Sequence, residues 1–350
     1  MAADENAILP PSETTPGGGG STTGVTDLSA DASANSYVIT AAGDFKFKAV
    51  KGNGTESVGT VAKVELLWET ENTATAPEAN AIIAKVGFED GYVTFSTPET
   101  LKPGNALIAV KDASDVILWS WHIWIPATEV VVWDSEAFCG GKMMDRNLGA
   151  LTATNAEGDV DPLSIGLYYQ WGRKDPFPGA TTFEKSPKGA AVAGTAWSKH
   201  PEKITTEYSV AHPTEYAYVP EVDAGVWNID DPQDLWNAGD NAKTVYDPCP
   251  PGYRVPLYDK TLPLWAGSDE GFTYDGSRVS YGDFHFTVAG YIDCWSAGYT
   301  YSNTRTHVWA SKYYDEKRGT CAYFRLDKDP KYYAQKYHKA KAGSVRCVAE

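Results

Sequence analysis

The chain contains few of the residues that most often carry catalytic or metal-binding chemistry. It has 6 histidines and 5 cysteines among 350 residues, with no Cys-x-x-Cys pair and no metal-ligand spacing. The Gly-x-Ser-x-Gly, His-Glu-x-x-His, P-loop and Gly-x-Gly-x-x-Gly motifs are also missing. We therefore expect a protein that is not an enzyme and holds neither a cofactor nor a metal ion. A polysaccharide-acting enzyme is the least favoured alternative, since the two carboxylates of a glycosidase leave no signature in an acidic chain.

Positive charge and long apolar runs are scarce as well. The 30 Lys and Arg residues face 46 Asp and Glu, which gives a formal net charge of -16 at pH 7. Nucleic acids and anionic membrane surfaces attract clustered cations, so neither is expected as a partner. No run of 18 or more apolar residues is present, so we expect no membrane-spanning segment.

The N-terminal stretch lacks the basic and apolar segments of a signal peptide and is rich in Pro, Thr and Gly as far as Gly24. Two interpretations fit: a cytosolic protein, or an exported protein whose leader has been removed. A stretch of this composition is typical of a flexible tether. We therefore expect residues 1–26 to anchor an exported protein at the cell surface or outer membrane.

Aromatic and turn-forming residues are abundant. The chain has 12 Trp, 21 Tyr, 32 Gly and 21 Pro, which indicates a mainly β protein with many turns and long loops. Between residues 27 and 127, about seven short strand-like segments are separated by turn signals, and this pattern predicts an immunoglobulin-like β-sandwich. The segments are Ser36–Thr40, Phe45–Val50, Ala62–Trp68, Ala81–Phe88, Tyr92–Ser96, Ala106–Asp112 and Ile117–Ile125.

The last of these segments has tryptophan on both faces. Trp119 and Trp121 share one face, and His122 and Trp124 share the other. The pattern predicts a central strand, or a strand that packs against the following domain. We expect the lone histidine in it to be structural.

Residues 128–350 change to short, irregular segments and long loops, α+β in class. The stretch Met143–Gly179 mixes apolar residues with charges that suit a buried ion-pair network of Asp145, Arg146, Arg173 and Asp175. The functional alternative is a clamp for a carboxylate or phosphate made by the two arginines.

Two other clusters have a functional and a plain interpretation. An acidic loop has the alternating oxygen ligands of a calcium site but not the EF-hand spacing, so a solvated loop is favoured. A basic, aromatic patch near the C-terminus either binds a ligand or is a solvated hairpin tip. The acidic loop contains Asn155, Glu157, Asp159 and Asp161, and the patch contains Tyr332, Tyr333, Lys336, Tyr337, Lys339 and Lys341.

The span Pro178–Tyr246 reads as a long loop, which is either functional or an insertion. Exposed aromatic rings in such a loop stack on sugars or anchor protein interfaces. The alternative is that they cover the core beneath the loop. The candidate ligand-binding residues are Trp197, Tyr208, Tyr216, Tyr218, Trp227 and Trp236.

Three local elements are also predicted. Asp231–Trp236 suits the start of a short helix. Pro263 limits the length of a second short helix. Thr306–Asp327 reads as a hairpin that turns at Glu316–Gly319.

Several motifs in fixed order resemble a known family. MMDRNLGA, LYYQWGRKDPFPG, DPCPPGYRVP, VWAS and the terminal SVRCV are similar to the FISUMP domain, the major paralogous domain of Fibrobacter and Bacteroidetes surface proteins. That domain is itself similar to the C-type-lectin-like fold. The upstream NSYVI and GDFKFKAVKGNG resemble the sandwich of fimbrillin-like and tip-adhesin lipoproteins. The resemblance spans residues 34–350 and implies a sandwich at 27–127 followed by a lectin-like domain at 128–350.

An odd number of cysteines permits at most two intrachain disulfides, and five free core thiols is the alternative. The lectin-like resemblance implies a disulfide between Cys249 and Cys347, which would stabilise the fold by up to about 4–5 kcal/mol. Cys294 with Cys321 is the second expected pair, and Cys139 is left free. The Glu-Pro-Asn, Gln-Pro-Asp and Trp-Asn-Asp motifs of calcium-dependent sugar-binding lectins are absent.

The resemblance implies a cell-surface binding or adhesion protein that presents its second domain to a glycan or a surface protein. A structural subunit or tip component of a surface filament, assembled by strand addition with other subunits, is the alternative.

Overall fold

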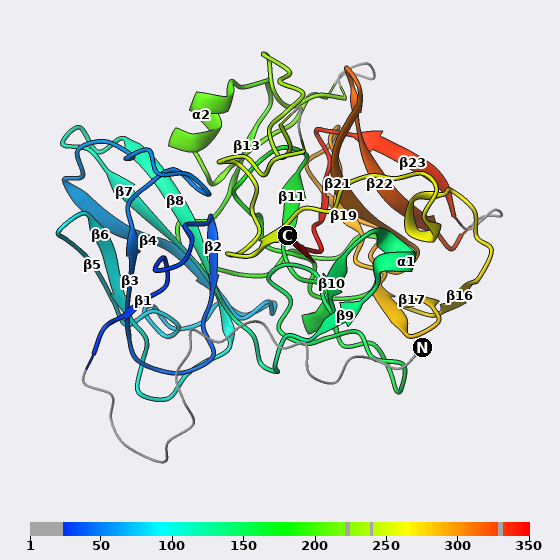
Figure 1. Cartoon of the computed structure of the whole chain (residues 1–350), viewed down its shortest axis with the longest axis horizontal. Helices are drawn as coiled ribbons and strands as arrows, with labels where there is room; N and C mark the ends of the chain where they lie inside the picture. Colours follow the sequence, from blue (N-terminus) through cyan, green and yellow to red (C-terminus); the bar gives the residue numbers. More distant parts are fainter. Residues whose placement is uncertain (1–23, 221–224, 239–240, 328–331) are drawn as a thin grey trace.

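The computed structural model describes residues 24–220, 225–238, 241–327 and 332–350. Figure 1 shows two regions side by side, with β1 to β8 in blue to cyan on the left and the later strands in green to red on the right. Strands far outnumber helices among these residues, so the predicted mainly β class is confirmed.

The left region is a pair of sheets that pack face to face. All seven predicted segments form strands there. The segment predicted to begin at Ala81 begins only at Lys85, because the backbone N–H groups of Ile82 and Ile83 donate to the Glu69 carboxylate instead of to a strand. One sheet has the order β1 (Thr26–Asp27), β3 (Asp44–Lys48), β6 (Tyr92–Ser96), β5 (Lys85–Glu89). The other has the order β12 (Ala193–Gly194), β4 (Lys63–Thr70), β7 (Gly104–Lys111), β8 (Ile117–Ile125), β2 (Ser36–Val38).

The core of this sandwich is built from every second side chain along the strands, because successive side chains point to opposite faces of a sheet. Phe47 of β3 contacts Trp121 of β8 across the two sheets, with ring centroids 5.1 Å apart. Trp119 and Ile123 lie on the same face of β8 and join the same apolar cluster. Aromatic contacts of this kind add to the stability that burial alone supplies.

The opposite face of β8 packs against the right-hand region. Trp124 is buried there and its Nε1–H donates to the backbone oxygen of Ala150 at 3.0 Å. His122 is also buried and lies 2.8 Å from the Asn105 side-chain oxygen, as expected of a structural histidine. The sequence predicted either a central strand or one that packs against the following domain, and β8 is both, since β7 and β2 flank it and Trp124 contacts Ala150.

The right-hand region also lends a strand to the sandwich. β12 comes from the span after Pro178 and pairs antiparallel with β4, Ala193 opposite Glu69. A single apolar cluster runs from the sandwich, through Leu107, into residues such as Leu148 and Trp171 of the second region. The two regions therefore share this apolar cluster, the shared core, while each also has apolar clusters of its own.

The second region is built from short strands in several small sheets. One has the order β15 (Tyr253–Arg254), β25 (Val348–Ala349), β10 (Lys142–Met144), β9 (Val132–Asp134). The largest has the order β20 (Tyr299–Thr300), β19 (Tyr291–Ile292), β24 (Ala342–Ser344), β21 (Arg305–Asp315), β22 (Arg318–Arg325), β23 (Tyr332–His338), with β11 (Tyr168–Gln170) on β24. The remaining strands are β16 (Phe272–Asp275), β17 (Arg278–Tyr281), β18 (Phe284–Thr287), β13 (Ser198–His200) and β14 (Glu215–Ala217).

Helical structure is brief. The helices are α1 (Glu136–Cys139) and α2 (Thr206–Ala211), with 3-10 turns η1 (Pro162–Ser164) and η2 (Pro263–Trp265). Pro263 begins η2, so the expected limit on that helix is confirmed. Residues Asp231–Trp236, all of them described, form no helix, and that prediction is wrong. The hairpin predicted in Thr306–Asp327 is confirmed as β21 and β22.

The cysteines follow the prediction only in part. Cys249 and Cys347 form a disulfide with their Cα atoms 6.0 Å apart, as the resemblance implied. The pairing of Cys294 with Cys321 is wrong, since both are buried free thiols. They lie in different apolar clusters, Cys294 beside Trp227 and Cys321 in the shared core. Cys139 is free, as expected, and contacts the Ser135 hydroxyl at 3.3 Å.

The predicted four-residue ion network is also wrong. Asp145 pairs with Arg146 at 2.7 Å, and Asp175 pairs with its neighbour Lys174, also at 2.7 Å. Arg173 donates instead to the backbone oxygens of Glu215 and His212. Buried guanidinium groups here donate to backbone carbonyls in loops and in short strands.

Candidate functional site

The six aromatic candidates of the long loop divide into two groups. Tyr216, Trp227 and Trp236 are buried, with at most 1% of each residue exposed. Their polar atoms donate to backbone oxygens, Trp227 to Trp171 at 2.8 Å and Trp236 to Arg173 at 3.2 Å. These three rings cover the core beneath the loop and offer no face to a ligand.

The other three candidates are half-buried and lie in different places. Trp197 and Tyr218 pack at the margin of the cluster that contains Tyr216. Tyr208, on α2, stacks on His212 with centroids 3.9 Å apart, and its hydroxyl donates to Glu215. The structure therefore does not gather the six predicted residues into one exposed surface.

The acidic loop does not form a metal centre in the described structure. The Asp161 carboxylate caps η1 by accepting the Leu163 N–H at 2.9 Å. In the part of the chain that the structure describes, no three His, Cys, Asp or Glu side chains lie close enough to hold a metal ion. The solvated-loop interpretation accounts for these residues.

The basic, aromatic patch is divided by the fold. Lys339 and Lys341 are buried and pair with Asp231 and Asp293. Lys336 is half-buried on β23 and reaches the hairpin beside it. The side chains of Tyr332 and Tyr333 lie outside the described part of the structure.

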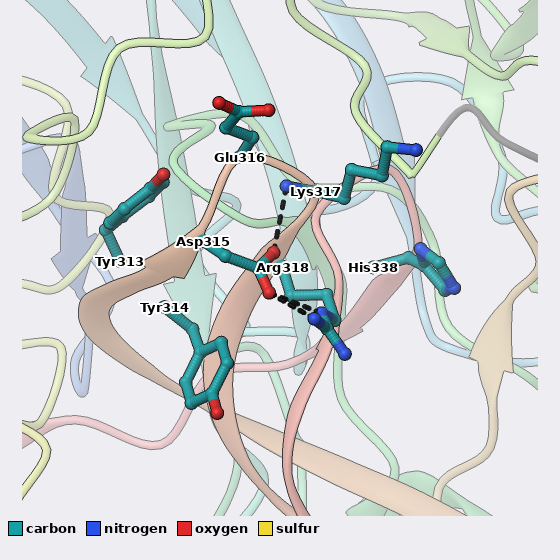
Figure 2. Close-up of a pocket in the computed structure, with 7 residues that line it drawn as sticks. All are labelled: Tyr313, Tyr314, Asp315, Glu316, Lys317, Arg318 and His338. Carbon is teal, nitrogen blue, oxygen red and sulfur yellow. Dashed lines mark hydrogen bonds and ion pairs between the residues drawn. The ribbon is translucent and has the colours of Figure 1, made fainter.

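A pocket of about 520 Å³ opens at the end of the β21–β22 hairpin. We call it the hairpin pocket, and Figure 2 shows its lining residues on the two strands, the turn and β23. They are Tyr313, Tyr314, Asp315, Glu316, Lys317, Arg318 and His338.

The turn of the hairpin is fixed by one carboxylate. Asp315 ends β21 and pairs across the turn with Arg318, which begins β22. Its side chain accepts the Lys317 N–H at 3.0 Å, and Arg318 Nε donates to it at 2.7 Å. Figure 2 shows this arginine placed between Asp315 and His338. A side chain that accepts a backbone N–H two residues on is a common way to hold a tight turn.

Tyr314 gives the hairpin pocket an exposed aromatic ring, with 43% of the residue accessible. Lys336 Nζ donates to its hydroxyl at 2.8 Å and lies 4.1 Å from the ring centroid. Tyr313, the residue before it, also lines the pocket, and Lys339 Nζ lies 4.6 Å from its ring centroid. The two tyrosines therefore have different surroundings despite being adjacent.

The charges of the hairpin pocket are defined near neutral pH. Burial raises the pKa of Asp315, but hydrogen bonds from Arg318 and from the Lys317 N–H outweigh it and leave the pKa below its usual value. Burial, with the charges of Lys341 and Arg318, lowers the pKa of His338. At pH 7 the pocket therefore contains the Asp315 carboxylate, the Arg318 guanidinium and a neutral imidazole, together with the side chains of Glu316 and Lys317.

The Asp315 carboxyl group does not have the raised pKa of a general acid. A general acid needs a carboxyl group whose pKa is raised toward the working pH, and that of Asp315 is lowered. Its carboxylate is also held by Arg318. The pocket therefore presents the Asp315–Arg318 ion pair beside the exposed Tyr314 ring.

Trp295, which the sequence analysis did not single out, extends the same surface. It lies in the turn between β19 and β20 with 37% of the residue exposed. Its ring is 5.4 Å from that of His338, centroid to centroid. Asp293, Ser296 and Gly298 around it are turn formers, and a tryptophan among them was the available signal.

Comparison with known proteins identifies no relative of this chain. No family model, curated protein or solved structure matches the chain. Among the described residues, the helices are all too short or too polar to cross a membrane.

Proposed function

We propose that this chain is a non-enzymatic binding or adhesion protein of the cell surface, which contacts glycans through the hairpin pocket. In this proposal the sandwich is immunoglobulin-like and supports a lectin-like second region of the FISUMP kind. The ordered motifs and the Cys249–Cys347 disulfide support the assignment. A disulfide also agrees with export, because such bonds persist in oxidising compartments.

One observation carries the choice of ligand: the exposed Tyr314 ring stands beside the Asp315–Arg318 pair in one pocket. An aromatic face packs against the C–H groups of a sugar ring, and charged planar groups bind its hydroxyls. A volume of about 520 Å³ falls in the range of small-molecule sites.

The second candidate function is a filament subunit that assembles by strand addition. β5 is an edge strand of its sheet, and Phe88 on it is 41% exposed. An exposed edge with an apolar residue is a surface on which another chain can add a strand. Concentration-dependent self-association in analytical ultracentrifugation would support this function over glycan binding.

The test of the first proposal is a glycan array, followed by calorimetry on the best ligand. We expect Tyr314→Ala to weaken binding at least tenfold. Tyr92→Ala is the matched control, because Tyr92 on the sandwich also has a lysine over its ring, Lys46 at 4.6 Å. Equal binding by wild type and Tyr314→Ala would contradict the proposed site, and released sugar products would favour an enzyme.

A further inference from the structure

Trp295 differs from most tryptophans of this protein. Eight others are among the largest fully buried side chains, whereas Trp295 is 37% exposed. Among the described residues, the well-exposed aromatic side chains are Phe88, Trp295 and Tyr314. Two of these three lie near His338: Tyr314 lines the same pocket, and the Trp295 ring contacts the His338 imidazole. An exposed tryptophan leaves part of its ring accessible to a ligand.

The ring of Trp295 is held in place from below. Asp293 accepts the Trp295 N–H at 3.1 Å with one carboxylate oxygen and the Lys341 ammonium at 2.8 Å with the other. Lys341 is buried, and its Nζ lies 4.6 Å from the Trp295 ring centroid. A ring that is positioned before binding loses little conformational entropy when a ligand stacks on it.

The hairpin pocket and the Trp295 ring are joined through one residue. His338 lines the pocket and also makes the edge contact with Trp295. Gly225 packs against its Nδ1, where an added Cβ would lie 2.2 Å away, so the imidazole has little room to turn. The two aromatic platforms therefore belong to one rigid surface.

We propose that this surface binds a neutral oligosaccharide of at least two sugar units, one unit against Tyr314 in the hairpin pocket and the next against Trp295. The inference rests on the proposed glycan-binding function and adds the ligand's length and charge. Trp295 is the second platform of the site, and His338 positions it relative to the first.

The inference that the ligand is neutral rests on the balance of charged side chains at the site. Arg318 is paired with Asp315, and Lys341 is paired with Asp293. Glu316 and Lys317 at the tip of the turn are both exposed and line the pocket, so with the Asp315–Arg318 pair the lining has no net formal charge. The lining therefore offers a uronic or sialic acid no net positive charge to attract its carboxylate.

The experiment is calorimetry on the full chain with glucose, galactose and mannose, their disaccharides and tetrasaccharides, and oligogalacturonate of the same lengths. We expect affinity to rise at least tenfold from one unit to two in a neutral series. Trp295→Ala should remove that gain, and Trp295→Phe should restore part of it. Tyr314→Ala should weaken every length.

The outcomes separate the two proposals. Binding of monosaccharides and tetrasaccharides with equal affinity, or an unchanged length gain in Trp295→Ala, overturns the two-unit site but keeps glycan binding. Tighter binding of oligogalacturonate overturns neutrality. No binding to any sugar in the series or on a glycan array overturns the proposed function itself. Phe88→Ala, which removes an exposed ring on the sandwich, is the control for general effects of lost aromatic surface.

Discussion

The sandwich and the second region reach a stable fold by different means. The sandwich consists of strands of up to nine residues whose alternating side chains fill one core. Many strands of the second region have two or three residues, too few to hold themselves by ladder hydrogen bonds. Buried side chains supply the missing partners there, as when Arg146 donates to backbone oxygens of Thr128 and Leu151. Irregular backbone can be buried when long polar side chains replace the strand partners it lacks.

The largest expected effect comes from the disulfide, which lies in the second region. Replacing Cys249 and Cys347 together with alanine should lower the free energy of unfolding by about 2–5 kcal/mol, because the disulfide closes a loop spanning 98 residues. Urea denaturation followed by tryptophan fluorescence measures the change. Cys139→Ala, which removes a free buried thiol, should cost clearly less. Equal losses would mean that the disulfide adds nothing beyond packing.

A comparable loss is expected from the arginine that replaces strand partners. Arg146→Met keeps the volume of the side chain but leaves Asp145 and several carbonyls buried without donors. Removing one member of a buried pair costs about 3–5 kcal/mol. Arg325→Met is the comparison, since its ion pair with Asp327 lies nearer the surface. A small loss in thermal and urea stability for Arg146→Met would contradict the role given to buried arginines.

The shared core predicts that the two regions unfold together. Leu107→Ala on β7 removes a fully buried side chain from the cluster that both regions contribute to. It should cost about 2–4 kcal/mol and leave a single transition in calorimetry, at a lower temperature. Two separate transitions, only one of them shifted, would show that the regions are independent.

The smallest expected effect is the loss of stability at acidic pH caused by His122. Burial lowers the pKa of His122 to about 3, so the folded state binds its proton only well below the unfolded value near 6.5. As pH falls through that window the unfolded state takes up the proton first, and stability falls, by about 2 kcal/mol at pH 5 from this group. His122→Gln should therefore lose less stability between pH 7 and pH 5 than the wild type. His200→Gln, at a half-exposed position, is the control, and an unchanged slope in His122→Gln would contradict the prediction.

The contrast between the regions also explains how far the sequence could be interpreted. Period-two alternation and turn signals were sufficient for the sandwich strands and for the β21–β22 hairpin, because these are repeating patterns. The Cys249–Cys347 pair came from a resemblance, and Cys294 with Cys321 failed because linear spacing does not show that they lie in different clusters. Trp227 and Trp295 have equally polar neighbours in sequence, yet one is buried and one exposed. Long-range packing alone decides between them.

The two-residue strand β12 changes how the molecule would respond to force. Gly194 lets the backbone approach β4 closely, since an added Cβ would lie 2.4 Å from the Leu67 oxygen. The sandwich and the second region are therefore joined by strand pairing as well as by the single covalent crossing after β8. If the N-terminus is tethered and a ligand is held at the far hairpin, tension would shear strands and core together. Separating the two regions would therefore break the β12–β4 pairing and the shared apolar cluster together.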